Sequence, residues 1–119
     1  MLPSHSPSSW EPLFNASQDG NDSLVLSLIS NGADVNLPNP NNSQSPLFVA
    51  AEKDHSKIVK ILLSHGANVN QSDSSGVSPL FTASENNNFE CVDILLQNGA
   101  NPNQSRNDGL TPFLVALQK

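Results

Sequence analysis

The sequence predicts an all-α fold, a solenoid of stacked helix–turn–helix units joined by β-turn or hairpin connections. A Pro-Leu-Phe motif, or a close variant of it, recurs at steps of 34, 33 and 33 residues, starting at Pro12, Pro46, Pro79 and Pro112. Twenty residues after each of the first three prolines stands a glycine: Gly32, Gly66 and Gly99. Apolar pairs at helical spacing lie in between. Such a period is typical of repeat architectures, in which stacked units share one continuous core.

Each unit is expected to begin with a short helix, over about 46–53 in the second unit. Proline suits the first helical turn, where its missing N–H is not needed. Ser45, Ser78 and Thr111 precede three of the prolines and can cap the helix. Four residues after each proline is an alanine, which is small where neighbouring helices pass close to each other: Ala16, Ala50, Ala83 and Ala116.

A second helix is expected in each complete unit because apolar residues recur there at helical spacing. They are Leu24, Val25, Leu28 and Ile29, then Ile58, Val59, Leu62 and Leu63, then Cys91, Val92, Leu95 and Leu96. The glycine that follows suits the left-handed position just past a helix end. Between the two helices, Gly20, Asp54 and Asn87 share one equivalent position. These residue types tolerate a positive φ best, so we expect one there.

Turns connect the units. Residues 73–76 and 106–109 each end in glycine after polar residues and are predicted to form tight turns. The connection over 37–45 has one extra residue, two prolines and no glycine. The sequence therefore leaves the geometry of that turn open.

Together these features resemble the ankyrin repeat family, whose unit of about 33 residues is a β-turn and two antiparallel helices marked by Thr-Pro-Leu-His-x-Ala. The likeness runs from about Trp10 to Lys119 and includes Gly-Ala-x-x-Asn at the end of each complete unit. It implies an L-shaped stack with first helices on a concave face. The family histidine, which hydrogen-bonds to the turn region, is replaced here by Phe14, Phe48, Phe81 and Leu114. We therefore expect a looser turn region.

The domain prediction is a disordered Ser/Pro-rich tail over 1–9 and a repeat domain over 10–119. The units are expected at about 10–38, 39–72, 73–105 and 106–119, the last of them incomplete. Repeat arrays end in a unit with a polar outer face, whereas the fourth unit has several apolar residues that nothing covers. The sequence therefore indicates a fragment, a truncated gene product or a chain that pairs through its end. Of these, we expect a fragment with further repeats downstream. Trp10 is expected to pack over the first unit, with a binding hot spot as the alternative.

Composition disfavours several partner classes. The net charge is −6 with only five Lys and Arg, whereas nucleic acid binding needs clustered basic residues. The group Lys53, Lys57 and Lys60 is interrupted by Glu52 and Asp54, which is typical of a solvated helix face. No apolar run approaches the roughly 18 residues of a membrane span. The first residues lack the pattern of a secretory signal, so we expect an intracellular, cytoplasmic protein, with the nucleus as an open alternative.

The sequence predicts no catalytic, cofactor, metal or small-molecule site. It lacks the Gly-x-Ser-x-Gly motif of many hydrolases, and its three histidines are scattered. We expect a structural role for His55 after the inter-helix turn, and an interaction of His65 with a helix C-terminus. Cys91 stands where other units have Leu24 and Ile58, so we predict a buried apolar group.

The predicted function is that of a protein–protein interaction scaffold without enzyme activity. The resemblance places binding residues on the turn tips and the exposed side of the first helices. Carried over to this sequence, the candidates are Gln18, Asp19, Asn41, Asn42, Gln44, Glu52, Lys53, Ser74, Ser75, Val77, Glu85, Asn86, Asn107, Asp108 and Leu110. Each of them could instead be simply solvated. Two other functions stay open: substrate-recognition repeats of a larger enzyme whose catalytic domain lies outside this chain, and a structural spacer.

Overall fold

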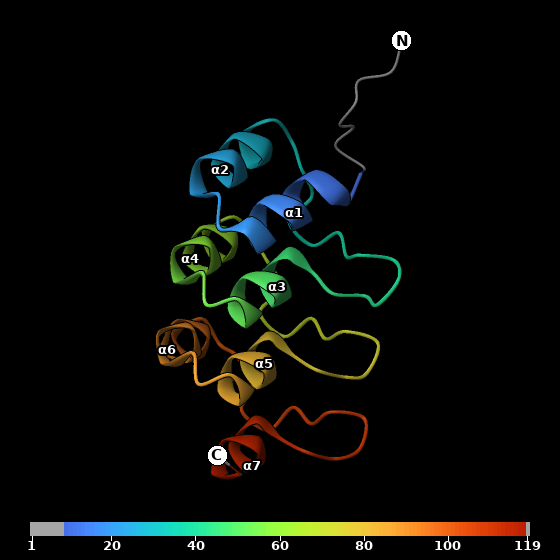
Figure 1. The fold of residues 1–119 in the computed structure, drawn as a ribbon, viewed down its shortest axis with the longest axis vertical. Helices are drawn as coiled ribbons and strands as arrows, with labels where there is room; N and C mark the ends of the chain where they lie inside the picture. Colours follow the sequence, from blue (N-terminus) through green and yellow to red (C-terminus); the bar gives the residue numbers. More distant parts are fainter. Residues whose placement is uncertain (1–8, 119) are drawn as a thin grey trace.

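The computed structural model describes residues 9–118, and in this range it contains helices and no strands. The helices are α1 (Glu11–Asp19), α2 (Asp22–Ser30), α3 (Pro46–Glu52), α4 (Ser56–Ser64), α5 (Pro79–Glu85), α6 (Phe89–Gln97) and α7 (Pro112–Leu117). Figure 1 shows α1, α3, α5 and α7 in one column and α2, α4 and α6 in a second column beside it. The predicted all-α solenoid is confirmed. Apart from Ser9, the tail predicted over 1–9 lies outside the described residues.

The first helices begin where the sequence predicts. The side-chain hydroxyls of Ser45, Ser78 and Thr111 accept hydrogen bonds from the backbone N–H three residues further on, at 3.1, 3.1 and 3.2 Å. The first unit differs, because Trp10 stands at the cap position and provides no side-chain cap. Its ring instead lies edge-on to Phe14, with 5.3 Å between the ring centroids. The predicted packing of Trp10 over the first unit is confirmed.

Positive φ angles occur at the predicted positions. Between the paired helices, φ is 76° at Gly20, 64° at Asp54 and 60° at Asn87. Two residues after each second helix, the glycines at 32, 66 and 99 have φ of 96°, 94° and 90°. Each unit therefore ends its helices through the same backbone reversal, even where glycine is absent.

Side chains between the helices tie each unit to the one before it. The His55 ring Nε2 lies 3.0 Å from the carbonyl oxygen of Gln18, which can only accept a hydrogen bond. At the same place in the next unit, the Asn88 side-chain amide donates to the carbonyls of Ala51 and Glu52 at 2.8 and 3.1 Å. These carbonyls end a first helix and lack partners within it. The structural role predicted for His55 is confirmed.

A ladder of asparagines joins the units at the other ends of the second helices. The Asn36 side-chain oxygen accepts a hydrogen bond from the Asn68 N–H at 2.7 Å, and the Asn70 oxygen accepts one from the Asn101 N–H at 2.8 Å. The side-chain amide of Asn36 also donates to the Gly66 carbonyl at 3.2 Å. These bonds span 31 or 32 residues in sequence, except the last, which spans 30. The side chains of Asn36 and Asn70 therefore fix one unit to the next.

Gly20 offers a test of how tightly the first two units meet. A Cβ added at Gly20 would lie 2.8 Å from His55 Cε1, whereas one added at Gly32 would meet nothing within 4 Å. Both glycines have positive φ, so alanine costs about 1–2 kcal/mol of backbone strain at either position. We expect Gly20→Ala to lower the free energy of unfolding by about 1 kcal/mol more than Gly32→Ala, because the His55 hydrogen bond is displaced. Urea denaturation measures both, and equal losses would contradict this contact.

Candidate protein-binding surface

Three connecting segments project from the first-helix column and are called fingers: 39–44, 73–77 and 106–110. Figure 1 shows them side by side at the right of the stack. Each finger is closed by a backbone hydrogen bond from the N–H of its first residue to the carbonyl of its last, at 2.8, 2.9 and 2.7 Å in chain order. The tight turns predicted at 73–76 and 106–109 are confirmed by bonds from Gly76 N to Asp73 O and from Gly109 N to Arg106 O.

The first finger, which the sequence left open, has the same closed form as the others. Ser43 has φ of 63° and takes the place of Gly76 and Gly109, whose φ angles are 81° and 90°. The Asn39 side-chain oxygen accepts a hydrogen bond from the Asn41 N–H at 2.9 Å, which stabilises the longer loop. The extra residue is thus contained within the tip.

Backbone hydrogen bonds join neighbouring fingers into one row. Ser74 N donates to Asn42 O at 3.0 Å, and Asn107 N donates to Ser75 O at 2.9 Å. The Asn107 side chain also donates to Ser74 O at 3.2 Å. The four residues belong to the predicted binding set, and all are at least partly exposed. The structure therefore brings the finger candidates together as a continuous surface.

A shallow hollow of about 410 Å³ lies between the second and third fingers. Its predicted members are Ser75, Val77, Asn107 and Asp108. Asp73 and Arg106, which the sequence did not mark as binding residues, also line it. One signal in the sequence could have identified Arg106 as a site residue. Arg106 begins a finger and stands two residues before Asp108.

Arg106 and Asp108 form the charged centre of this hollow. The Arg106 Nε and Nη2 atoms donate to the two Asp108 carboxylate oxygens at 3.0 and 2.6 Å. The bond from Arg106, aided by the N–H of Leu110, lowers the pKa of Asp108 to about 2. Both groups are therefore charged at neutral pH, and a polar partner meets a fixed ion pair here.

The same guanidinium lies over the ring of Phe81, 5.1 Å from its centroid. Phe81 is buried and stands where the resemblance led us to expect histidine. A cation over an aromatic ring is attracted by the negative face of that ring. This contact links the third finger to α5, the first helix of the preceding unit, in place of the missing histidine bond. The looser turn region stays a prediction.

The remaining candidates lie mostly at the far ends of the first helices from the fingers. Gln18 and Asp19, Glu52 and Lys53, and Glu85 and Asn86 end α1, α3 and α5 or follow them directly, and each is at least partly exposed. A seven-residue helix is about 10 Å long, so this second row is separated from the fingers by about that distance. Gln44 and Leu110 close the first and third fingers and are partly buried.

A family model described as ankyrin repeats, in three copies, matches residues 13–106. The chain belongs to the ankyrin repeat family. Ankyrin repeats are generally protein–protein interaction modules, and such domains are typically non-catalytic scaffolds. No curated protein matches the chain.

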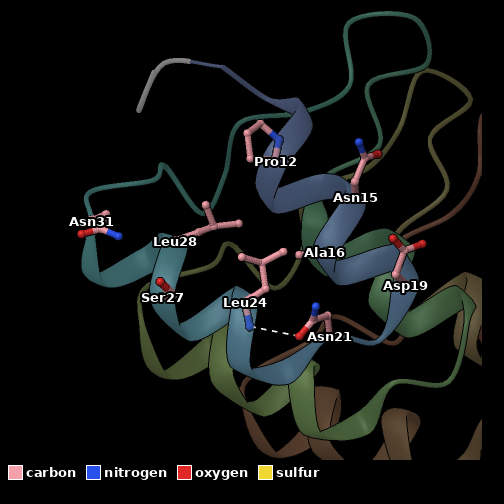
Figure 2. Close-up of a pocket in the computed structure, with 9 residues that line it drawn as sticks. All are labelled: Pro12, Asn15, Ala16, Asp19, Asn21, Leu24, Ser27, Leu28 and Asn31. Atoms are coloured by element: carbon pink, nitrogen blue, oxygen red, sulfur yellow. Dashed lines mark hydrogen bonds between the residues drawn. The ribbon is translucent and has the colours of Figure 1, made fainter. Parts of the chain in front are cut away.

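A further groove lies at the N-terminal end of the ankyrin stack, between α1 and α2, with a volume of about 450 Å³. Figure 2 shows Pro12, Leu24 and Leu28 pointing into it, and the predicted candidate Asp19 at its edge. The Asn21 side chain accepts a hydrogen bond from Leu24 N at 3.1 Å, so it caps its own helix. Of the residues that line this groove, only Asp19 is among the binding residues predicted from the sequence.

Residues 9–118 contain no group of three or more His, Cys, Asp or Glu that could hold a metal ion, and no helix long and apolar enough to cross a membrane. His65 Nδ1 lies 2.9 Å from the Ile61 carbonyl, which confirms its predicted contact with a helix end. His5 lies outside the described residues.

Cys91 is fully buried, and its Sγ lies 3.6 Å from an Asp54 carboxylate oxygen. Burial, followed by the charge of Asp54, raises the pKa of the thiol to about 12. The reactive form of cysteine is the thiolate, so this thiol is held in its unreactive form. The predicted buried apolar group is confirmed.

Cys91 should therefore report the opening of the stack. At about pH 8, close to the ordinary pKa of cysteine, we expect slow reaction with a soluble disulfide reagent in the folded chain and fast reaction in urea. The pKa of Cys91 is higher in the folded chain than in the unfolded chain, so the neutral thiol stabilises the fold at pH values below the unfolded-state pKa. This contribution to the free energy of unfolding is lost as the pH rises toward 12. Rapid labelling without denaturant would contradict the burial.

Proposed function

We propose that this ankyrin array is a scaffold that binds another protein along its fingers and the exposed side of its first helices. The observation that carries this proposal is the row of fingers hydrogen-bonded to one another, from Asn42 through Ser74 and Ser75 to Asn107. A surface that is ordered before binding loses little conformational entropy when a partner docks. No catalytic step is assigned to this surface.

The chemistry of the fingers describes the partner surface. Most candidates on the fingers are uncharged polar residues. Arg106 and Asp108, both on the third finger, already form an ion pair with each other. Polar interfaces of this kind keep bridging water and rely on hydrogen bonds. We therefore expect a polar, hydrated interface of modest affinity, with little dependence on salt.

A matched pair of variants tests the proposal. Ser75 and Ser64 are both exposed serines, on the second finger and on α4 respectively. A photo-crosslinking residue is placed at each position in turn. We expect a covalent adduct with one partner protein from position 75 only. Ser75→Arg should abolish capture of that partner, while Ser64→Arg leaves it unchanged and both keep the helical circular dichroism of the parent chain.

The proposal fails if no protein is captured at micromolar concentrations. It also fails if position 64 gives the adduct and position 75 does not. Equal capture by both arginine variants would point instead to a structural spacer or to another surface.

A further inference from the structure

The hollow between the second and third fingers has both of its walls within the described chain. Its volume is about 410 Å³, and it lies where the Asn107 N–H donates a hydrogen bond to the Ser75 carbonyl at 2.9 Å. Figure 1 shows the two fingers, 73–77 and 106–110, side by side along the stack. The backbone bond holds both walls in place before a partner arrives. The side chains that line the hollow therefore decide what it can receive.

Asp73 uses one of its two carboxylate oxygens to shape the second finger. Its Oδ1 accepts hydrogen bonds from the N–H groups of Ser75 and Val77, both at 2.9 Å. Among residues 9–118, none donates a hydrogen bond to Oδ2 or forms an ion pair with this carboxylate. A carboxylate has about four acceptor positions. Asp73 can therefore accept a donor from another molecule without giving up its place in the turn.

Arg106 does not neutralise the carboxylates around it. Its Nε and Nη2 atoms are both engaged by Asp108, and its guanidinium lies over the ring of Phe81. The hydrogen bond with Asp108, together with the charges of Asp108 and Glu85, raises the pKa of this guanidinium. One cation thus faces Asp108 and Glu85, while Asp73 lines the same hollow. The hollow and its edge keep an excess of negative charge.

An acidic group of a partner is disfavoured at this place. It would meet Asp73 and Asp108, and it could reach the bonded edge of Arg106 only by breaking the ion pair with Asp108. Like charges that face each other across an interface are strongly unfavourable. The described lysines, at 53, 57 and 60, follow α3 or lie on α4, so none of them lines the hollow. A positive group from outside the chain is the complement.

Val77 adds an apolar wall to the charged hollow, and its side chain is partly buried. Lysine and arginine lay their long apolar stems along such a surface and keep the charged end in a polar place. The corresponding positions between the first and second fingers carry Asn39 and Ser75 in place of Asp73 and Asp108. The excess charge is therefore local, and a local charge can set the register in which a partner docks.

We propose that the hollow between the second and third fingers receives one basic side chain, lysine or arginine, of the partner protein. Its charged end pairs with Asp73 and with the exposed side of Asp108, and its stem lies against Val77. The inference rests on the proposed function, because it names the residue type that the bound protein presents to the fingers. A single pair of this kind adds little dependence on salt, as expected for the fingers as a whole.

The first experiment measures the charge preference of the hollow without a partner. Two small nitroxides with the same ring, one cationic and one anionic, are added separately to the full chain, and NMR records the relaxation of backbone amide protons. We expect the cation to relax the amides of Ser75, Val77 and Asn107 more strongly than the anion. Asp73→Asn should reduce the ratio of the two effects by about twofold or more, because one charge is removed nearby.

Asp34→Asn is the matched control for Asp73→Asn. Asp34 is also an aspartate whose Oδ1 accepts a backbone bond two residues on, from Asn36 N at 2.9 Å, and it lies outside the fingers. Asparagine keeps an acceptor at Oδ1 in both variants, so each removes a charge and leaves the turn intact. The control should leave the ratio at Ser75 and Asn107 unchanged.

The second experiment uses the protein captured by the photo-crosslinking residue at position 75. The crosslinked peptide is sequenced, and we expect a lysine or arginine within about three residues of the linked position, because an extended chain advances about 3.5 Å per residue. Asp73→Asn should weaken binding of this protein by about fivefold, and Asp34→Asn should not. Replacing the partner's basic residue by alanine should cause a similar loss, and combining it with Asp73→Asn should add nothing further.

The outcomes separate this inference from the proposed function. Capture of a partner at position 75 with no basic residue near the link, or with unchanged binding by Asp73→Asn, overturns the inference and leaves the scaffold in place. Additive losses in the combined variants, or equal effects of the two nitroxides at Ser75 and Asn107, overturn it as well. Failure to capture any protein overturns the proposed function, and the basic side chain with it.

Discussion

Phe81→Ala is expected to lower the free energy of unfolding by about 3–5 kcal/mol, the largest effect of any single substitution proposed for this chain. The side chain is completely buried in α5, between units two and four of the stack. Its removal leaves a cavity and also takes away the ring beneath the Arg106 guanidinium. Because each unit is stabilised by its neighbours, we expect the loss to extend to the third finger and α7.

Phe113→Ala is the matched control, since it removes the same side chain from a position that is 66% exposed. Its effect should stay within about 0.5 kcal/mol, as for other surface substitutions. Urea denaturation followed by circular dichroism measures both variants. Similar losses from the two would show that Phe81 does not occupy the packed site described above.

Asn88→Ala should cost about 1–3 kcal/mol, because it removes the side-chain hydrogen bonds to the carbonyls of Ala51 and Glu52 in a largely buried place. The Ala51 carbonyl keeps a longer bond from the Asp54 N–H, at 3.3 Å. Asn88→His should recover much of this stability, since His55 makes the equivalent contact with Gln18 one unit earlier. The pair separates the loss of a hydrogen bond from the loss of side-chain volume, because histidine restores the donor with a different shape.

Asn103→Ala serves as the control for Asn88, because Asn103 is an exposed asparagine at the end of the third unit. Its substitution should change stability by no more than about 0.5 kcal/mol. Thermal and urea unfolding of Asn88→Ala, Asn88→His and Asn103→Ala measure these changes in stability. The interpretation of Asn88 is wrong if histidine is no better than alanine at this position.

Local features of the sequence predicted the helices well. Proline after serine or threonine marked the starts of α3, α5 and α7, and the hydroxyl caps are present in the structure. The shared position of Gly20, Asp54 and Asn87 predicted the left-handed backbone found there. Such features succeed because each depends on a few neighbouring residues and not on the packing of the whole stack.

Contacts between distant residues could not be predicted in the same way. The bond from Asn68 to Asn36 joins residues 32 positions apart and depends on how two units are rotated against each other. The placement of Arg106 over Phe81 and between two fingers likewise requires the finished stack. For this reason, the sequence identified most of the finger surface, including Asp108, but missed Arg106, the other half of its charged centre.

The form of the first finger bears on how partner choice can change in such an array. One additional residue is accommodated between Asn39 and Gln44, and the closing bond at the base of the loop is kept. The helices on either side retain their spacing. Insertions at a tip can therefore remodel the contact surface of one unit while its scaffold stays intact, so recognition can evolve separately from folding.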